Sequence, residues 1–333
     1  MNALNNKRVL LLAPKFFNYH LEIKKTLQDC GADVTYFDER PSNSFLTKIM
    51  IRLNITLFIH YKLKKYFNRI IIEAKNKKSD YLFLVNPEAI DGNVIKQLKK
   101  QCPNILVIVY MWDSLKNKKK LATLIPFADK FFSFDPEGPA IHKKVKFLPL
   151  FYINKYATSS SNDCKKKYDI SFVGTVHSDR YNIAKNVKHI AAKQGLTTYF
   201  YFYSPSKLLF FLQKLFLKEF KDINVKDISF KQLSYDEVLD ILNQSKSVLD
   251  IQHPNQKGLT MRTIEMLGNK KKLITTNKEI RQYDFYDPQN IIVFDKHNKT
   301  LDLDIINQEY NQVSSHIYNN YSISSWIDTI FNR

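Results

Sequence analysis

The chain has 333 residues, of which 44% are hydrophobic and 14% aromatic, and its 51 basic and 32 acidic side chains give a net charge of +19. This length supports two domains of ordinary size, and the apolar content excludes a disordered chain. The positive charge predicts attraction to polyanions, which include nucleic acid, anionic lipid surfaces and phosphorylated substrates.

Cysteine use and the first residues bear on the cellular compartment. The three cysteines, Cys30, Cys102 and Cys164, are far apart and form no C-x-x-C pair. This spacing predicts neither a disulfide framework nor a zinc site, and it fits a reducing cytoplasm. The opening MNALNNKRVLLLAP lacks the apolar run of a signal peptide, and no segment reaches the ~18 uncharged apolar residues of a membrane span. We therefore expect a cytoplasmic protein, either soluble or peripheral at the inner membrane.

The first half of the chain alternates apolar runs with helical patterns. The apolar runs are residues 8–14, 32–40, 81–87, 104–114, 130–138 and 146–151. Helical patterns separate them, and the first of these stops at Gly31. Continuous apolar strands with helices between them predict a parallel sheet that is covered on both faces. We assign residues 1–152 to this N-terminal Rossmann-like domain.

A polar stretch at residues 152–168 has the composition of a linker, and a second strand–helix series follows it. The predicted strands lie within residues 168–180, 197–204, 228–252, 273–277 and 290–296. We assign residues 168–315 to a second Rossmann-like domain and residues 316–333 to a C-terminal helical segment. The predicted fold class is α/β, with two parallel-sheet domains that face each other across a cleft. Ligands of such sheets bind beyond the carboxyl ends of the strands.

The segment VGTVHSDR follows a buried strand of the second domain. Gly174 allows a tight turn and the close approach of a phosphate, and Arg180 lies where a helix begins and suits a diphosphate. Alternatively, Gly174 is an ordinary turn residue and Arg180 a solvated one. The chain has no G-x-G-x-x-G or Walker loop and only 7 glycines, which argues against an NAD-dependent Rossmann enzyme.

The segment 251–277 predicts a loop, a short helix from about Thr260 to Leu267, and a buried strand. Free N–H groups at the helix start and the fork of Arg262 suit phosphate, whereas Glu265 suits the hydroxyls of a sugar. His253 and Asn255, just before this helix, are further candidates for contact with a sugar or its phosphates. The alternative is a surface helix capped by Thr260 with solvated charges.

The run GLTMRTIEMLGNKKKLITTN resembles the donor-nucleotide segment of GT-B glycosyltransferases, especially the bacterial, CgeB-like enzymes that build lipopolysaccharide and capsule. The specific match covers this run, and a weaker architectural match covers most of the chain. Many retaining members carry Glu-x7-Glu, but the position of the first glutamate is Lys257 here. The stereochemical outcome therefore stays open.

This resemblance implies a nucleotide-sugar donor, a saccharide or lipid-linked acceptor, and a C-terminal helix that crosses back to the first domain. It implies no catalytic metal or other cofactor, because helix dipoles and cationic side chains stabilise the leaving diphosphate. The first loop of the N-terminal domain, with Asn18 and His20, would contact the acceptor, although a lone histidine is more often structural. The expected donor-binding residues are Gly174, Arg180, His253, Arg262, Thr263 and Glu265.

Asp113 is the candidate catalytic base. It ends an apolar strand of the first domain, and an inverting transfer needs a carboxylate or histidine to accept the proton of the acceptor hydroxyl. A structural alternative is that Asp113 caps the next turn while Trp112 packs in the core. Glu88, Asp135 and Glu137 are rival carboxylates, but their surroundings are typical of turns.

Two segments, residues 44–75 and 206–220, mix apolar and basic side chains. Each suits an anionic membrane surface or, alternatively, a core-covering helix with snorkelling lysines, and the second alternative is favoured for residues 44–75. Two other functions stay open. One is a nucleic-acid-binding protein, although no recognisable module predicts a specific nucleic acid partner. The other is a sugar-nucleotide epimerase of the same fold.

Overall fold

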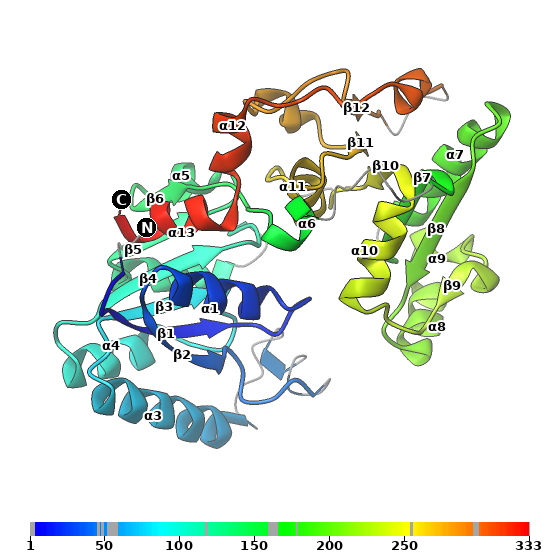
Figure 1. The fold of residues 1–333 in the computed structure, drawn as a ribbon. Helices are drawn as coiled ribbons and strands as arrows, with labels where there is room; N and C mark the ends of the chain where they lie inside the picture. Colours follow the sequence, from blue (N-terminus) through cyan, green and yellow to red (C-terminus); the bar gives the residue numbers. More distant parts are fainter. Residues whose placement is uncertain are drawn as a thin grey trace. The chain divides into compact units, whose positions relative to one another are not determined.

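The computed structural model describes residues 4–44, 47, 50–51, 59–116, 119–158, 166–177, 179–253, 256–295 and 300–332 (Figure 1). The chain forms two compact units. Unit 1 comprises Met1–Leu150 and Ile323–Arg333, and unit 2 comprises Phe151–Ser322. Cys30 and Cys102 are free thiols, and Cys164 lies outside the described residues.

Unit 1 contains a six-stranded parallel sheet in the order β2-β1-β3-β4-β5-β6. Its strands are β1 (Arg8–Ala13), β2 (Asp33–Asp38), β3 (Tyr81–Val85), β4 (Leu106–Met111), β5 (Lys130–Ser133) and β6 (Val145–Phe147). The central strands are buried almost throughout, as their continuous apolar sequences predict. The direction of winding reverses between β1 and β3, so the loops after these two strands lead to opposite faces of the sheet.

The helices of unit 1 connect and cover these strands (Figure 1). They are α1 (Tyr19–Asp29), α3 (His60–Asn76), α4 (Gly92–Gln101), α5 (Gly138–Ile141) and the 3-10 helix η2 (Lys119–Phe127). The chain leaves α1 through Gly31, which has a left-handed φ of 94° that only glycine adopts without strain. The buried side chains of α3 recur every three or four residues, which gives the helix one apolar face toward the core.

The last helix, α13 (Ile323–Asn332), belongs to unit 1 although it follows unit 2 in the sequence. The ring of Trp326 lies 4.7 Å from that of Tyr110 on β4. Lys130 Nζ donates to the carbonyl oxygens of Ile330 and Phe331 at 3.2 and 2.9 Å, where the helix leaves carbonyl groups without intrahelical partners. The chain thus returns to its first sheet at its end.

Unit 2 contains a second six-stranded parallel sheet, in the order β12-β11-β10-β7-β8-β9. Its strands are β7 (Tyr168–Thr175), β8 (Thr198–Tyr203), β9 (Ile228–Ser229), β10 (Ser245–Asp250), β11 (Lys272–Thr275) and β12 (Ile291–Val293). This is the doubly wound order, in which the direction of winding reverses between β7 and β10. The loops after β7 and β10 therefore define the place where a ligand is expected.

The helical segments of unit 2 are mostly short (Figure 1). The α-helices are α6 (Asn154–Thr158), α7 (Arg180–Lys193), α8 (Lys207–Phe216), α9 (Lys218–Lys221), α10 (Tyr235–Asn243), α11 (Met261–Gly268) and α12 (Ser315–Asn320). The 3-10 helices are η3 (Val225–Asp227), η4 (Lys278–Gln282) and η5 (Asp304–Asn307). None of the described helices combines the length and apolar content needed to span a bilayer.

Two local features differ from the pattern that the sequence predicts. Gly174 is not in a turn but inside β7, paired with Phe202, and an added Cβ there would lie 2.8 Å from the ring of Phe172. The predicted linker begins later than residue 152, because Tyr152 N donates to Tyr321 O at 2.8 Å and Tyr156 O accepts from Asn269. These contacts attach residues 151–158 to unit 2.

Candidate functional site

A carboxylate at the end of β10 fixes the start of α11. Asp250 Oδ2 accepts hydrogen bonds from the hydroxyls of Thr260 and Thr263, at 2.6 and 2.8 Å. Thr260 is also the N-cap, because its hydroxyl accepts from Thr263 N at 3.2 Å. Asp250 is buried, so both bonds are shielded from water. The first turn of α11 is therefore held against the carboxyl end of β10, at the winding reversal of the sheet.

Arg262 and Glu265 form an ion pair on α11, with 2.9 Å between Arg262 Nη1 and Glu265 Oε2. Their side chains are only 20% and 7% exposed, so neither charge is in bulk solvent. Glu265 also hydrogen-bonds the hydroxyl of Tyr156, and burial together with this carboxylate raises the pKa of Tyr156. Glu265 thus already serves as an acceptor within the unit.

Arg180 joins the ends of the two strands at the winding reversal. Its Nη2 donates to Ile251 O at 2.7 Å, after β10, and its Nη1 donates to Thr175 O at 3.3 Å, at the end of β7. Arg180 Nε has no hydrogen-bond partner within the described part of the chain. Burial lowers the pKa of Arg180, although nearby Asp250 acts to raise it. An anion at this position would stabilise the buried guanidinium.

Two histidines lie beside Arg180, in the loops after β7 and β10. The ring centroids of His177 and His253 are 5.7 Å apart. Burial, and then the charges of Arg180 and His253, lower the pKa of His177 to about 4. His177 is therefore neutral near pH 7, which limits positive charge beside Arg180. The sequence-predicted candidate His253 is exposed, and Asn255 lies outside the described residues.

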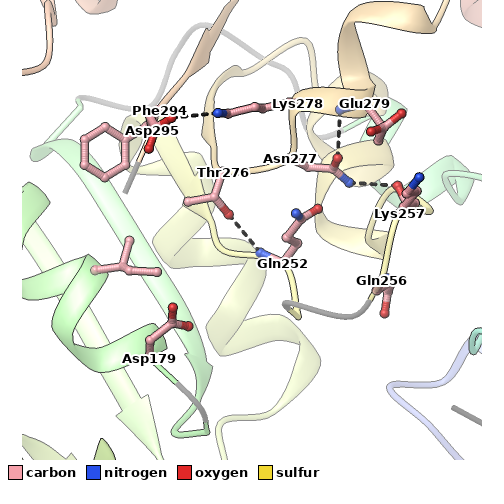
Figure 2. A pocket seen from close by; sticks show the side chains of 11 residues that line it. Asp179, Gln252, Gln256, Lys257, Thr276, Asn277, Lys278, Glu279, Phe294 and Asp295 are labelled. Carbon is pink, nitrogen blue, oxygen red and sulfur yellow. Dashed lines mark hydrogen bonds and ion pairs between the residues drawn. The ribbon is translucent and has the colours of Figure 1, made fainter. Parts of the chain in front are cut away.

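A pocket of about 380 Å³ opens at the same carboxyl edge of the unit 2 sheet (Figure 2). It is formed by the loops after β7, β10, β11 and β12 and by the start of α7. The lining residues are Asp179, Ile183, Gln252, Gln256, Lys257, Thr276, Asn277, Lys278, Glu279, Phe294 and Asp295. A concave site at this edge is where ligands of doubly wound sheets bind.

Hydrogen bonds hold the loops of this pocket together, as Figure 2 shows. Gln252 N donates to Thr276 Oγ1 at 3.2 Å, which joins the loops after β10 and β11. Asn277 donates to Lys257 O at 3.0 Å, and its own side-chain oxygen accepts from Glu279 N at 3.0 Å. The backbone around the pocket is therefore preorganised by internal contacts.

The side chains that line the pocket combine several kinds of polar group with an apolar wall. Gln252 Oε1 is buried and has no hydrogen-bond partner within the described part of the chain, and its side chain lies at the centre of Figure 2. Asp295 is paired with Lys278 at 2.6 Å on one side, next to Phe294. Amide, carboxylate and apolar groups together suit a ligand with a ring, donor groups and hydroxyls.

The sequence-predicted donor residues do not line this pocket. The structure brings Arg180, Thr263 and Asp250 together at the neighbouring winding reversal, and Arg262 and Glu265 follow on α11. Gly174 lies in β7, where its missing side chain makes room for Phe172 and for Arg180, whose Nη1 lies 3.4 Å from the place of a Cβ. Gln252, Asn277 and Asp295 were not predicted. Their sequence signal is their position just after apolar strands.

The carboxyl edge of the unit 1 sheet holds Asp113, beyond β4. Its Oδ2 accepts a hydrogen bond from Asn86 Nδ2 at 3.1 Å, and Asn86 follows β3 with a left-handed φ of 44°. The ring centroid of the preceding Trp112 lies 6.3 Å from that of Phe16 and 6.4 Å from that of Tyr19. Asp113 is thus half-buried beside aromatic side chains. Its rival Glu88 is buried in an ion pair with Arg40, and Asp135 accepts from Glu137 N in a turn.

Asn18 and His20 lie after β1, also at this edge of unit 1. Asn18 is exposed at the start of α1, with a left-handed φ of 63° and no side-chain cap. His20 is buried beside the ring of Tyr36, at 5.1 Å between centroids, and burial lowers its pKa. Its Nδ1 has no hydrogen-bond partner among the described residues. Asn18 is therefore the more accessible of the two.

Within the described residues no cluster of histidine, cysteine and acidic side chains could hold a metal ion.

Comparison with known proteins adds the fold family. The sequence matches no family model and no curated protein. The structure is similar to Anabaena HepE in complex with UDP-glucose, with a TM-score of 0.60 at 8% identity over 98% of each chain. It is also similar to the lipopolysaccharide outer core galactosyltransferase WaaB, with a TM-score of 0.53 at 11% identity over 98% of this chain and 99% of that one. A third similarity, to UDP-GlcNAc 2-epimerase from Methanocaldococcus jannaschii, has a TM-score of 0.53 at 12% identity over 98% of this chain and all of the other (100%).

These similarities cover nearly the whole chain, and they agree with the two parallel sheets of the structure. The chain has the GT-B fold of two Rossmann-like domains, as the sequence predicts. Because the identities are so low, the comparisons establish the fold and leave the reaction to the site.

Proposed function

We propose that the protein is a glycosyltransferase that uses a nucleotide-sugar donor. The observation that supports this most is the carboxyl edge of the unit 2 sheet. There the lining of the polar pocket around Gln252 includes Asp179, which precedes Arg180, and the loop that leads into α11, the helix of Arg262. A nucleoside diphosphate needs a concave site for its base and ribose and cationic donors for its phosphates. UDP-glucose bound to HepE and UDP-GlcNAc bound to the epimerase are ligands of that kind.

In this proposal the nucleoside occupies the pocket and the diphosphate lies toward Arg180, His253, Arg262 and the N–H groups at the start of α11. Negative charge grows on the leaving diphosphate as the sugar departs. A guanidinium that strengthens its contacts with that charge lowers the barrier to transfer. Electrostatic stabilisation of this kind needs no metal, and we propose none.

Glu265 has two proposed tasks that are compatible. Its ion pair with Arg262 holds the guanidinium in place, at 2.9 Å. An ionised carboxylate has about four acceptor positions, so the ion pair with Arg262 and the hydrogen bond from Tyr156 are compatible with a further bond from a hydroxyl. We therefore propose that Glu265 accepts a ribose hydroxyl while it positions Arg262, and that Thr263 keeps the helix start in place through Asp250.

The acceptor is proposed to bind at the carboxyl edge of the unit 1 sheet. Asp113 is the proposed base that removes the proton of the acceptor hydroxyl, and Asn18 and His20 are the proposed acceptor contacts. We further propose a saccharide or lipid-linked acceptor of lipopolysaccharide or capsule synthesis, reached at the cytoplasmic face of the inner membrane. This finer assignment is supported by the resemblance of residues 258–277 to enzymes of that class, and WaaB has the same fold.

The test begins with a thermal-shift screen against UDP-, GDP-, CMP- and dTDP-sugars, because a ligand that binds the native state raises its melting temperature. With the best donor, we predict that Arg262→Ala raises the donor KM and lowers kcat by about 100-fold, since the charge of the leaving group grows in the transition state. Arg281→Ala, at an exposed arginine of η4, is the matched control and should be unchanged. Wild-type turnover of a folded Arg262→Ala protein would refute the proposal.

A sugar-nucleotide epimerase is the second candidate, because one of the similar structures has that activity. The two reactions differ in their need for an acceptor. An epimerase converts the nucleotide sugar without any acceptor, whereas a transferase shows only slow hydrolysis of the donor alone. Incubation of the protein with the donor selected by the screen, followed by analysis of the sugar, distinguishes them.

A further inference from the structure

Helix α8 of unit 2 presents an apolar face to solvent. Leu208, Leu215 and Phe216 are 71%, 68% and 74% exposed. Three further apolar side chains are between 42% and 51% exposed, namely Phe211, Leu212 and Leu217. A soluble protein rarely exposes so many large apolar side chains within ten successive residues, and an exposed apolar patch marks an interaction site.

The helix is attached to unit 2 by a single fully buried side chain. Phe210 is completely buried, and its ring centroid lies 6.1 Å from that of Phe220 and 5.9 Å from that of Phe230. The N-cap is satisfied, because Ser206 Oγ accepts from Leu209 N at 3.3 Å. The helix is therefore a formed element with its inner side packed, and its outer apolar side is left for another partner.

Basic side chains surround this apolar face. Residues 207–222 contain four lysines, at 207, 214, 218 and 221, against two acidic residues, Glu219 and Asp222, so the segment has a net charge of 4 − 2 = +2. Lys207, Lys218 and Lys221 are exposed. Among the described residues, none of these four lysines forms an ion pair with a carboxylate. Lys214 Nζ donates to the carbonyl oxygens of Lys221 and Ile223, so the three exposed lysines are the ones that flank the apolar side chains. Apolar side chains flanked by exposed lysines match the boundary of an anionic bilayer.

Helix α3 of unit 1 gives a contrast, because it is also rich in lysine. Its apolar residues Leu63, Phe67 and Ile70 are buried in the core of unit 1. Only Tyr61 and Ile72 are large exposed apolar side chains on this helix. The lysines of α3 therefore lie on the solvated side of a core-covering helix, whereas those of α8 lie beside an uncovered apolar face.

We propose that α8, together with α9, docks on the surface of an anionic lipid bilayer. Leu208, Leu215 and Phe216 enter the boundary between headgroups and acyl chains, and the lysines contact lipid phosphates. A second copy of the chain fits less well, because a two-fold contact through α8 brings the lysines of both copies together. A bilayer neutralises the same charges. This proposal rests on the proposed function, because it explains how a transferase would reach a membrane-bound acceptor. Lipid binding is measured without a nucleotide-sugar donor. A failure of the docking proposal can therefore be distinguished from a failure of the proposed transferase activity.

The experiment is flotation of the full-length protein with two kinds of vesicle, phosphatidylcholine alone and equal parts of phosphatidylcholine and phosphatidylglycerol. We expect binding to the anionic vesicles, weakened by added salt, and little binding to the neutral ones. The variant with Leu215→Ser and Phe216→Ser should bind at least tenfold more weakly. The matched variant with Tyr61→Ser and Ile72→Ser on α3 should bind as wild type. Thermal melting confirms that both variants are folded.

Three results would overturn the proposal. In the first, the α8 variant binds anionic vesicles as well as wild type does. In the second, the α3 variant loses binding instead. In the third, wild type binds neither kind of vesicle and forms a dimer that the α8 variant does not form, which would assign the face to a second copy. A further variant with Lys207→Gln and Lys218→Gln should keep the fold and reduce the salt dependence of vesicle binding.

Discussion

The carboxyl edges of the two sheets have the same architecture but different side chains. In unit 2 the edge combines Arg180, Arg262 and a polar pocket with the side chain of Gln252 at its centre, whose Oε1 has no hydrogen-bond partner within the described ranges. In unit 1 the edge combines exposed aromatic rings with the buried Asn86, which donates to the half-buried Asp113. The two folds are alike because both follow from apolar strands and covering helices. The difference therefore comes from the loops, where function is added to a fold.

The difference also indicates which ligand suits which edge. Partly buried cations beside hydrogen-bonding amides suit an anionic ligand with a base and hydroxyls. Phe16, which is 46% exposed, and Trp112 have rings 6.3 Å apart, and aromatic surfaces of this kind suit the apolar faces of a saccharide. One carboxylate beside such a surface can accept a proton from a bound hydroxyl. The comparison thus supports the proposal of a charged donor at unit 2 and a saccharide or lipid-linked acceptor at unit 1.

The largest expected effect comes from breaking the acceptor edge alone. We predict that Asp113→Asn lowers kcat by about 100-fold, because loss of a general base costs at least that factor. The dissociation constant of the nucleotide sugar should not change, since the donor is assigned to the other unit. Steady-state kinetics and calorimetric titration measure the two quantities, and Asp33→Asn, at an exposed aspartate of the opposite sheet edge, is the control. Weaker donor binding in Asp113→Asn would argue against the division of tasks.

A second prediction concerns the stability of the donor edge at low pH. Because the pKa of His177 is about 4 in the folded protein and near 6.5 in the unfolded chain, only the unfolded chain binds a proton between these values. The stabilisation is complete above pH 6.5 and is lost as the pH falls toward 4. It amounts to about 2 kcal/mol after allowance for the partial exposure of the ring. Urea unfolding at pH 7 and pH 4.5 should show a smaller stability difference for His177→Gln than for wild type, and an equal difference would exclude a buried neutral ring.

The smallest predicted effect tests the pocket itself. Gln252→Leu keeps the size of the side chain and removes the buried amide, whose oxygen has no partner among the described residues. We expect nucleotide affinity to fall about tenfold, the usual cost of one lost polar contact to a ligand. Gln194→Leu, at the C-cap of α7 and bonded to Leu301 O, is the matched control, because the pocket lies at the other end of this helix. If calorimetry shows equal affinity for Gln252→Leu and wild type, the nucleoside binds elsewhere.

Much of the fold is predictable because each strand is an apolar run of its own. The runs at 81–87 and 273–277 become β3 and β11, and the helical pattern after residue 14 becomes α1. Strand β9 has only two residues, so the predicted segment 228–252 locates a strand there without fixing its bounds. The position of Gly174 inside β7 was not predictable, because its reason is the nearby ring of Phe172 and not the local backbone.

The sequence predicts a candidate site at these strand ends, but only part of the contacts that the structure shows there. Arg180 and the start of α11 follow from strand ends and from a short motif, which are local features. The ion pair of Arg262 with Glu265 has the i,i+3 spacing that a helix brings together. The link of Glu265 to Tyr156 depends on a residue more than a hundred positions away, so sequence spacing gives no sign of it. The pocket is assembled from four loops, and each contributes only a few residues.

Hydrogen exchange with and without a nucleotide diphosphate tests the central assignment most directly, because the amides of both sheet edges are followed in one experiment. The probes are UDP, GDP and dTDP, each added to the full-length protein. The account predicts slower exchange, for at least one of them, in the loops after β7, β10, β11 and β12, and unchanged exchange at residues 14–20 and 110–114 of unit 1. Slower exchange confined to those unit 1 segments, or no change with any of the three, would contradict it.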